Sequence, residues 1–153
     1  MRVEYINPFI ESAVEILTMT VSEKITTGEI GLRKNITAIY GVAIIVGLAG
    51  EVSGRVVIDM DKTTALNIVS KMNEETMTEL DEMACSTLTE LANMITGNAV
   101  TKLHDLGFKF DLTPPALIKG DNLELMDNKV ESLVVPIEMP EGRVEVNVAI
   151  KEN

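Results

Sequence analysis

The chain has 153 residues, 46% of them apolar, and a formal net charge of −11 at pH 7. This is enough apolar sequence for one domain with a buried core, which argues against wholesale disorder. The scarcity of aromatic and clustered basic residues argues against nucleic-acid binding, and the negative charge disfavours anionic membranes. With one cysteine, Cys85, and no signal-peptide pattern, we expect a single cytoplasmic domain over residues 1–153.

The N-terminal half predicts a helix followed by a β-hairpin. Residues 5–21 carry apolar side chains at helical spacing, and Asn7 with Pro8 is a candidate cap and first-turn pair. Residues 36–48 are rich in Ile and Val, which predicts a strand covered on both faces over part of its length. A hairpin turn over residues 49–54 and a returning strand over 54–60 complete this part.

The C-terminal half predicts two helices and then strands. Asp61 or Thr63 is expected to cap a short helix, and the longest helix is expected over residues 78–106, ending before Gly107. Strands are predicted at 116–118, at 130–139 and, after a turn at 140–142, through the alternating valines to the end. The fold class is therefore α+β, a mainly antiparallel sheet with an N-terminal helix and a long helix packed on it.

The long helix has two faces of different character. One face is an apolar stripe that must meet the core, formed by Ala84, Leu88, Leu91, Ala92, Ile95, Ala99 and Leu103. On the opposite face, Ser86, Glu90, Asn93 and Gly97 recur at spacings of four, three and four. Glu90 and Asn93 are therefore neighbours on the predicted solvent side of the helix.

Two residues on this face are unfavourable in a helix. An interior Asn costs roughly half a kcal/mol relative to Ala, and an interior Gly about 1 kcal/mol. An exposed Glu such as Glu90 is ordinary by itself, but Asn93 beside Gly97 indicates that another surface approaches this face. Met83 and Met94 border the face, either as an adaptable docking rim or as core or dimer contacts.

Other reactive side chains have simpler interpretations. Cys85 is expected to be a small core or helix residue, because no nearby His or Lys favours a thiolate. His104, the one histidine, lies near the helix C-terminus and is expected to be structural or exposed. Asp81 and Glu82 fit a solvated helix start better than an acid–base pair, and no residue pattern predicts a metal site in this chain.

The motif and its flanks resemble the signature helix of the CheC, CheX and FliY phosphatases. Ser86, Glu90 and Asn93, followed about twenty residues later by Pro114-Pro115, match the family pattern. CheC-type proteins usually carry two copies of the motif, whereas Glu11 and Glu15 in the first helix have no Asn three residues later. The single copy favours the CheX family.

This resemblance implies an enzyme that removes the phosphoryl group from the aspartate of a CheY-like response regulator. Asn93 would hold the attacking water and Glu90 would pair with a lysine of the regulator, while Ser86, Gly97 and Met94 would contact it. The resemblance also implies that the regulator supplies the Mg²⁺, that this chain binds no cofactor, and that it forms a homodimer with no nucleic-acid or membrane partner.

Two alternatives remain open at the level of sequence. The same fold would serve as an adaptor or sensor that binds a phosphorylated regulator without hydrolysing its phosphate, although a pure binder has no use for a water-orienting amide. The other alternative is an unrelated dimeric α+β structural protein in which the motif is a coincidence. In that case, replacing Asn93 by Ala would leave stability unchanged or raise it slightly, with no other effect.

Overall fold

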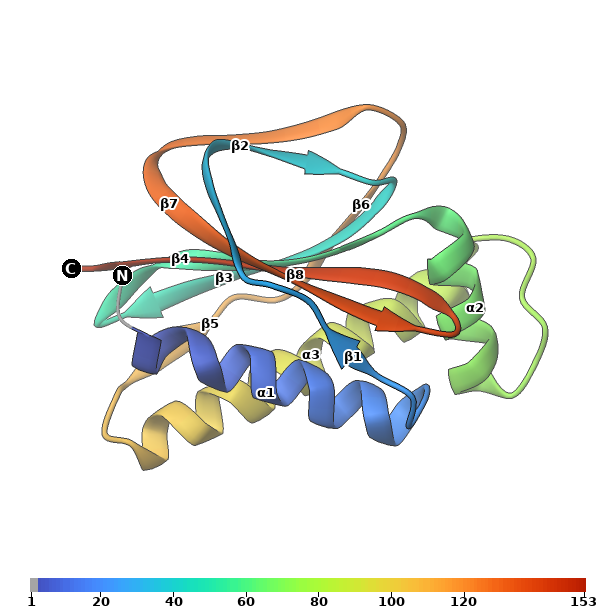
Figure 1. The fold of residues 1–153 in the computed structure, drawn as a ribbon, viewed down its shortest axis with the longest axis horizontal. Helices are drawn as coiled ribbons and strands as arrows, with labels where there is room; N and C mark the ends of the chain where they lie inside the picture. Colours follow the sequence, from blue (N-terminus) through green and yellow to red (C-terminus); the bar gives the residue numbers. More distant parts are fainter. Residues whose placement is uncertain (1–2) are drawn as a thin grey trace.

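The computed structural model describes residues 3–153, with the side chains of all but residues 34–39 and 126–130. An antiparallel sheet of eight strands carries the helices on one face, while an arm formed by residues 31–39 and their pairing partners within residues 123–134 arches over the other (Figure 1). The helices are α1 (Val3–Thr20), α2 (Lys62–Asn73) and α3 (Glu82–Asp105). The strands are β1 (Thr26–Thr27), β2 (Gly31–Ile39), β3 (Val42–Gly50), β4 (Val52–Met60), β5 (Phe110–Leu112), β6 (Ala116–Lys119), β7 (Leu123–Met139) and β8 (Gly142–Glu152).

The strand order places the C-terminal strands at the centre of the sheet. The main path runs β1-β7-β8-β4-β3-β5, with β2 also paired to β7 and β6 also paired to β3. Every pairing is antiparallel. The predicted fold class, a mainly antiparallel sheet with an N-terminal helix and a long helix packed on it, is confirmed.

Helix α1 begins earlier than the sequence indicated. It has already formed at Val3, so Asn7 and Pro8 lie inside it and are not its cap and first turn. The extra turn is held by burial, because Tyr5 and Phe9 are in the core and the Tyr5 ring packs edge-on against Phe108, with centroids 4.9 Å apart. Pro8 has no N–H group, so α1 lacks one backbone hydrogen bond, and this aromatic packing offsets the loss.

The strand predicted over residues 36–48 is two strands that do not pair with each other. Strand β2 ends before Tyr40 and β3 begins after Gly41. Gly41 has a φ of +139°, a conformation that residues with a side chain disfavour. Strand β2 pairs with β7, whereas β3 pairs with β4. The β3–β4 turn is also tighter than the predicted 49–54, since only Glu51 lies between the two strands.

Strands β7 and β8 also differ from the prediction in extent and place. Strand β7 starts at Leu123 instead of residue 130, because its first half finds a partner in β2. The alternating sequence of the C-terminal strand would suit an exposed edge for a dimer contact, but β8 pairs with β4 on one side and, over residues 142–148, with β7 on the other. The homodimer itself stays a prediction.

The main core lies between the sheet and the three helices. All seven apolar residues predicted for the buried stripe of α3 are buried, and none is more than 1% exposed. Asp61 caps α2 as expected, since its carboxylate accepts a hydrogen bond from the Thr64 amide at 2.7 Å. Burial of this stripe fixes which face of α3 points to solvent.

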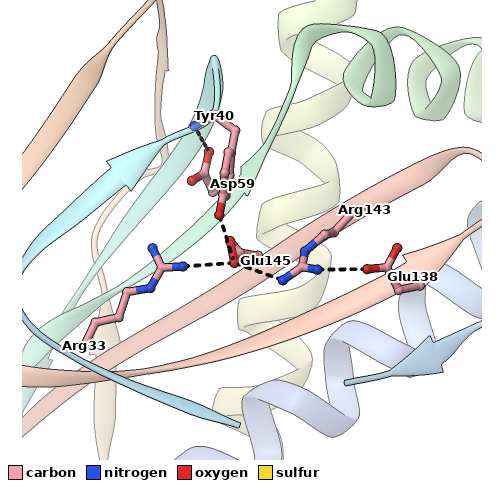
Figure 2. A network of polar contacts seen from close by, with 6 residues as sticks. All are labelled: Arg33, Tyr40, Asp59, Glu138, Arg143 and Glu145. Carbon is pink, nitrogen blue, oxygen red and sulfur yellow. Dashed lines mark hydrogen bonds and ion pairs between the residues drawn. The ribbon is translucent and has the colours of Figure 1, made fainter. Parts of the chain in front are cut away.

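The other face of the sheet buries charged groups under the arm. Glu145 of β8 is 4% exposed and accepts hydrogen bonds from Arg33 (3.1 Å), the Tyr40 hydroxyl (3.2 Å) and Arg143 (3.5 Å) (Figure 2). Asp59 of β4 lies beside them and accepts a hydrogen bond from the Tyr40 amide at 2.9 Å. These contacts tie β2 to the centre of the sheet, and they explain why Glu145 is buried as well as the valines of β8.

Asp59 is the strained member of this network. Burial raises the pKa of its carboxyl group from 3.8 to about 6, with Glu145 adding to the rise and the Tyr40 amide opposing it. The folded protein therefore holds a proton on Asp59 more tightly than the unfolded chain does. The free energy of unfolding contributed by this group is fully present below the unfolded pKa of 3.8 and is lost as the pH rises through about 6.

Replacing Asp59 with Asn is expected to stabilise the protein at pH 7.5 by about 2–3 kcal/mol, because the amide keeps an oxygen for the Tyr40 N–H without a buried charge. The gain should shrink as the pH is lowered toward 4.5. Urea unfolding of both proteins across this range measures it, with exposed Asp121→Asn as the control. A gain that is the same at every pH would contradict the assignment.

Candidate functional site

Helix α3 carries the candidate site and has well-defined ends. Its cap is Asp81, whose carboxylate accepts a hydrogen bond from the Ala84 amide at 2.9 Å. The helix therefore starts at Glu82, not at residue 78, and it ends as predicted just before Gly107. The interpretation of Asp81 and Glu82 as a helix start is confirmed.

The structure brings Ser86, Glu90, Asn93 and Gly97 onto one stripe, which we call the motif stripe. Ser86, Glu90 and Asn93 are exposed and Gly97 is half-buried, while the opposite side of the helix is buried. Because the buried side fixes the rotation of the helix, the Glu90 carboxylate and the Asn93 carboxamide are held outward as neighbours. The stripe can therefore meet another molecule without any rearrangement of the core.

Gly97 has no packing role inside this chain. A β-carbon built on it meets no atom within 4 Å, so nothing in the described structure requires a glycine here. A helix-interior glycine costs about 1 kcal/mol relative to alanine. The glycine leaves the stripe flat at this point, so another surface can approach the helix backbone closely there.

The two methionines beside the stripe differ. Met94 is half-buried and packs against the main core, so it combines a core role with a partly open edge. Met83 is 60% exposed, which leaves its thioether available at the surface. Of the two roles expected for these methionines, Met94 therefore has the core contact while keeping one edge exposed. Met83 remains exposed at the border of the stripe.

Helix α1 borders the motif stripe through a polar cluster that sequence reasoning did not identify. Lys102 of α3 lies 2.8 Å from the Glu15 carboxylate and 3.7 Å from that of Glu11, and the Asn98 amide donates to Glu15 at 3.0 Å. Hydrogen bonds from Lys102 and then Asn98 lower the pKa of Glu15. In the sequence, this cluster could have been found from the matching four-residue spacings of Glu11 with Glu15 and of Asn98 with Lys102, which place each pair on one helix face.

The remaining singled-out residues lie off the stripe. Cys85 is half-buried in the first turns of α3, and the His104 ring lies 3.2 Å from the Phe110 carbonyl oxygen, in keeping with structural roles. Pro114 and Pro115 separate β5 from β6, two strands that both pair with β3. Among the described residues, no cluster of three His, Cys, Asp or Glu could hold a metal ion, and no helix is long and apolar enough to cross a membrane.

Comparison with known proteins gives this geometry a context. The family model described as chemotaxis phosphatase CheX matches residues 42–138, which is more than half of the chain. The chain belongs to the CheX family. The CheY-P phosphatase CheX of Thermotoga maritima is 29% identical over 141 residues, covering 92% of this chain and 88% of the relative.

Solved structures of the CheX family and its superfamily agree with the fold. CheX in the CheX–CheY–BeF₃–Mg²⁺ complex of Borrelia burgdorferi is 46% identical, with a TM-score of 0.86, 99% of this chain covered and 100% of that chain. A CheC-like superfamily protein of Shewanella sp. PV-4 is 27% identical, with a TM-score of 0.90 and 99% of each chain covered. The CheX fold therefore extends over nearly the whole of this chain.

Replacing Gly97 with Ala is expected to raise the free energy of unfolding by about 0.5–1 kcal/mol, because the methyl group enters open space and the helix gains propensity. Denaturant unfolding measures the change. Gly54→Ala is the matched control and should destabilise, since its β-carbon would collide with the Ala149 carbonyl oxygen. A loss of stability in Gly97→Ala would show that the glycine serves this chain's own packing.

Proposed function

We propose that this protein dephosphorylates the aspartyl phosphate of a CheY-like response regulator. The observation that carries the proposal is the Glu90–Asn93 pair, held outward on α3 by a fully buried opposite face in a chain of the CheX family. The printed name of the Thermotoga relative, CheY-P phosphatase, and the Borrelia complex of CheX with CheY support the same substrate.

The residue types suit hydrolysis of an acyl phosphate. This bond is already reactive, so the enzyme's main task is to place one water in line with the leaving carboxylate oxygen. The Asn93 carboxamide can accept a hydrogen bond from that water and donate another, and it stays neutral beside the phosphoryl group. Asn93 would thus be the catalytic residue, acting by position and without a covalent intermediate.

Glu90 would fix the register of docking. A carboxylate one turn from the water-positioning amide can pair with a lysine of the regulator in a contact that loses its water on binding. Ser86 and Gly97 are small, which lets α3 approach the regulator closely, and the open edge of Met94 would border the contact. In this arrangement Glu90 contributes mainly to affinity and orientation.

The metal required by this chemistry would belong to the regulator. Mg²⁺ neutralises phosphoryl oxygens during transfer, and it is part of the Borrelia CheX–CheY complex. This chain would contribute only the Asn93 amide and the Glu90 carboxylate. Mg²⁺ would already balance the phosphoryl charge in the active site of the regulator. Regulator phosphorylation is an intracellular event, so we also propose a cytoplasmic place of action.

Asn93→Ala is expected to lower the accelerated rate of phosphate loss by about 10²-fold or more, with regulator affinity nearly unchanged. Glu90→Ala should instead weaken regulator binding by about tenfold or more. The measurement is decay of acyl phosphate on a purified, ³²P-labelled CheY-like regulator of the same organism, with binding measured separately.

Glu4→Ala provides the control, because this exposed glutamate lies in the first turn of α1 and not on the motif stripe of α3. Both test variants should unfold at the wild-type denaturant concentration or slightly above it, because alanine has the higher helix propensity. Binding without any acceleration by the wild-type protein would favour the adaptor alternative, and an unaltered rate in Asn93→Ala would remove the proposed role of the amide.

Removing Mg²⁺ with EDTA is expected to abolish the acceleration, and restoring Mg²⁺ should recover it. Titrating Mg²⁺ into the phosphatase alone should give no saturable heat, whereas the regulator alone should bind it. A saturable Mg²⁺ site on this chain would contradict the assignment of the metal to the regulator.

A further inference from the structure

The exposed face of α3 continues beyond the motif stripe toward the start of the helix. Met83 lies three residues before Ser86 and seven before Glu90, which places it within about 20° of Glu90 around the helix. Its side chain is 60% exposed, whereas the next residue, Ala84, is fully buried. A large apolar side chain therefore stands in open solvent on the same side of the helix as Glu90.

Met83 also forms one wall of a cleft. The cleft has a volume of about 380 Å³ and is lined by residues 75–79 of the α2–α3 connection, together with Asp81 and Met83. Glu75 and Glu79 are exposed on its walls, and no basic residue lines it. We call this surface, with Met83 at its edge, the α3 entry cleft.

The walls of the α3 entry cleft are held in place. The Met77 amide donates to the Ser70 hydroxyl at 2.8 Å, and the Glu75 amide donates to the Ser70 carbonyl at 3.2 Å. The side-chain amide of Asn73 donates to the Thr87 hydroxyl of α3 at 3.0 Å, and the Lys119 ammonium group donates to the Leu80 backbone carbonyl at 3.0 Å. A cleft fixed at both ends in this way is formed before any partner arrives, which limits the ordering cost of binding.

The size of a protein interface brings the cleft within reach of the regulator. A stable contact buries about 800 Å² on each partner, which is a disc of roughly 16 Å radius. At 1.5 Å per residue, Met83 lies about 15 Å along the helix from Asn93. An interface of this typical size centred on Asn93 would reach Met83 and the near wall of the cleft.

We propose that the α3 entry cleft is a second docking subsite for the CheY-like regulator, with Met83 as a specificity-determining residue; this rests on the proposed phosphatase function. Met83 packs against an apolar side chain of the regulator, and Glu79 with Glu75 faces a basic one. Two features favour the regulator as the occupant: the acidic walls of the cleft, and the position of Met83 on the same helix as the motif stripe. Met83 is a positioning residue and does not touch the reacting atoms.

The test compares affinity with turnover for the wild-type protein and for Met83→Ala. Affinity is the Kd for the purified regulator activated with beryllofluoride and Mg²⁺, and turnover is the decay of its acyl phosphate under saturating phosphatase. Met83→Ala is expected to weaken binding about five- to tenfold and to leave the saturated rate within about twofold. Met83→Leu, which keeps an apolar side chain of similar volume, should restore the Kd.

Glu79→Gln tests the charged wall of the cleft. It is expected to weaken binding about two- to threefold and to make the Kd less sensitive to added NaCl, because an attraction between exposed charges is screened by salt. Leu106→Ala is the matched control, since Leu106 is 62% exposed on the far end of α3, about 20 Å along the axis from Asn93. Its Kd should equal that of the wild type.

The outcomes separate this inference from the function on which it rests. If the wild-type protein accelerates phosphate loss but Met83→Ala binds as tightly as wild type, the second subsite is wrong and the phosphatase function stands. An equal loss of affinity in Leu106→Ala would also overturn the subsite. If the wild-type protein neither accelerates phosphate loss from any regulator of the organism nor binds an activated one, both proposals fail together.

Discussion

Burial of one face of α3 is the constraint on which the site depends. Leu88, Leu91 and Ile95 are at most 1% exposed, and together they fix both the rotation and the height of the helix on the sheet. Burying side chains of this size stabilises a fold by roughly 1.5–3 kcal/mol each, far more than the residues on the outer face contribute. The outer face is therefore free to carry an amide and a glycine that a helix would otherwise avoid.

The sequence was informative where the local pattern carried the structure. Helical spacing located α3 and its two faces, and Asp61 and Gly107 marked helix ends, because capping and amphipathicity are short-range properties. The break at Gly41 and the early start of β7 escaped prediction, since they depend on pairing with strands distant in the chain. The position of β8 inside the sheet was missed for the same reason.

The candidate site follows the same division. Ser86, Glu90 and Asn93 were found because their spacing is a local feature of one helix. The cluster of Glu15 with Lys102 and Asn98, and the cleft beside Met83, join α3 to α1 and to the α2–α3 connection. Such neighbours appear only when the helices are placed in space, and Met83 and Met94, alike in sequence, separate into an exposed and a half-buried side chain for the same reason.

The proline pair after α3 has a consequence of a different kind. Strands β5 and β6 form the outer rim beyond β3, and Pro114 and Pro115 interrupt that rim between them. Proline lacks an N–H group, and an unbroken row of such groups on an edge strand invites a second sheet to add to it. The interruption leaves the rim as two short segments, so this edge of the protein is guarded against aggregation in an acidic chain that works by meeting other proteins.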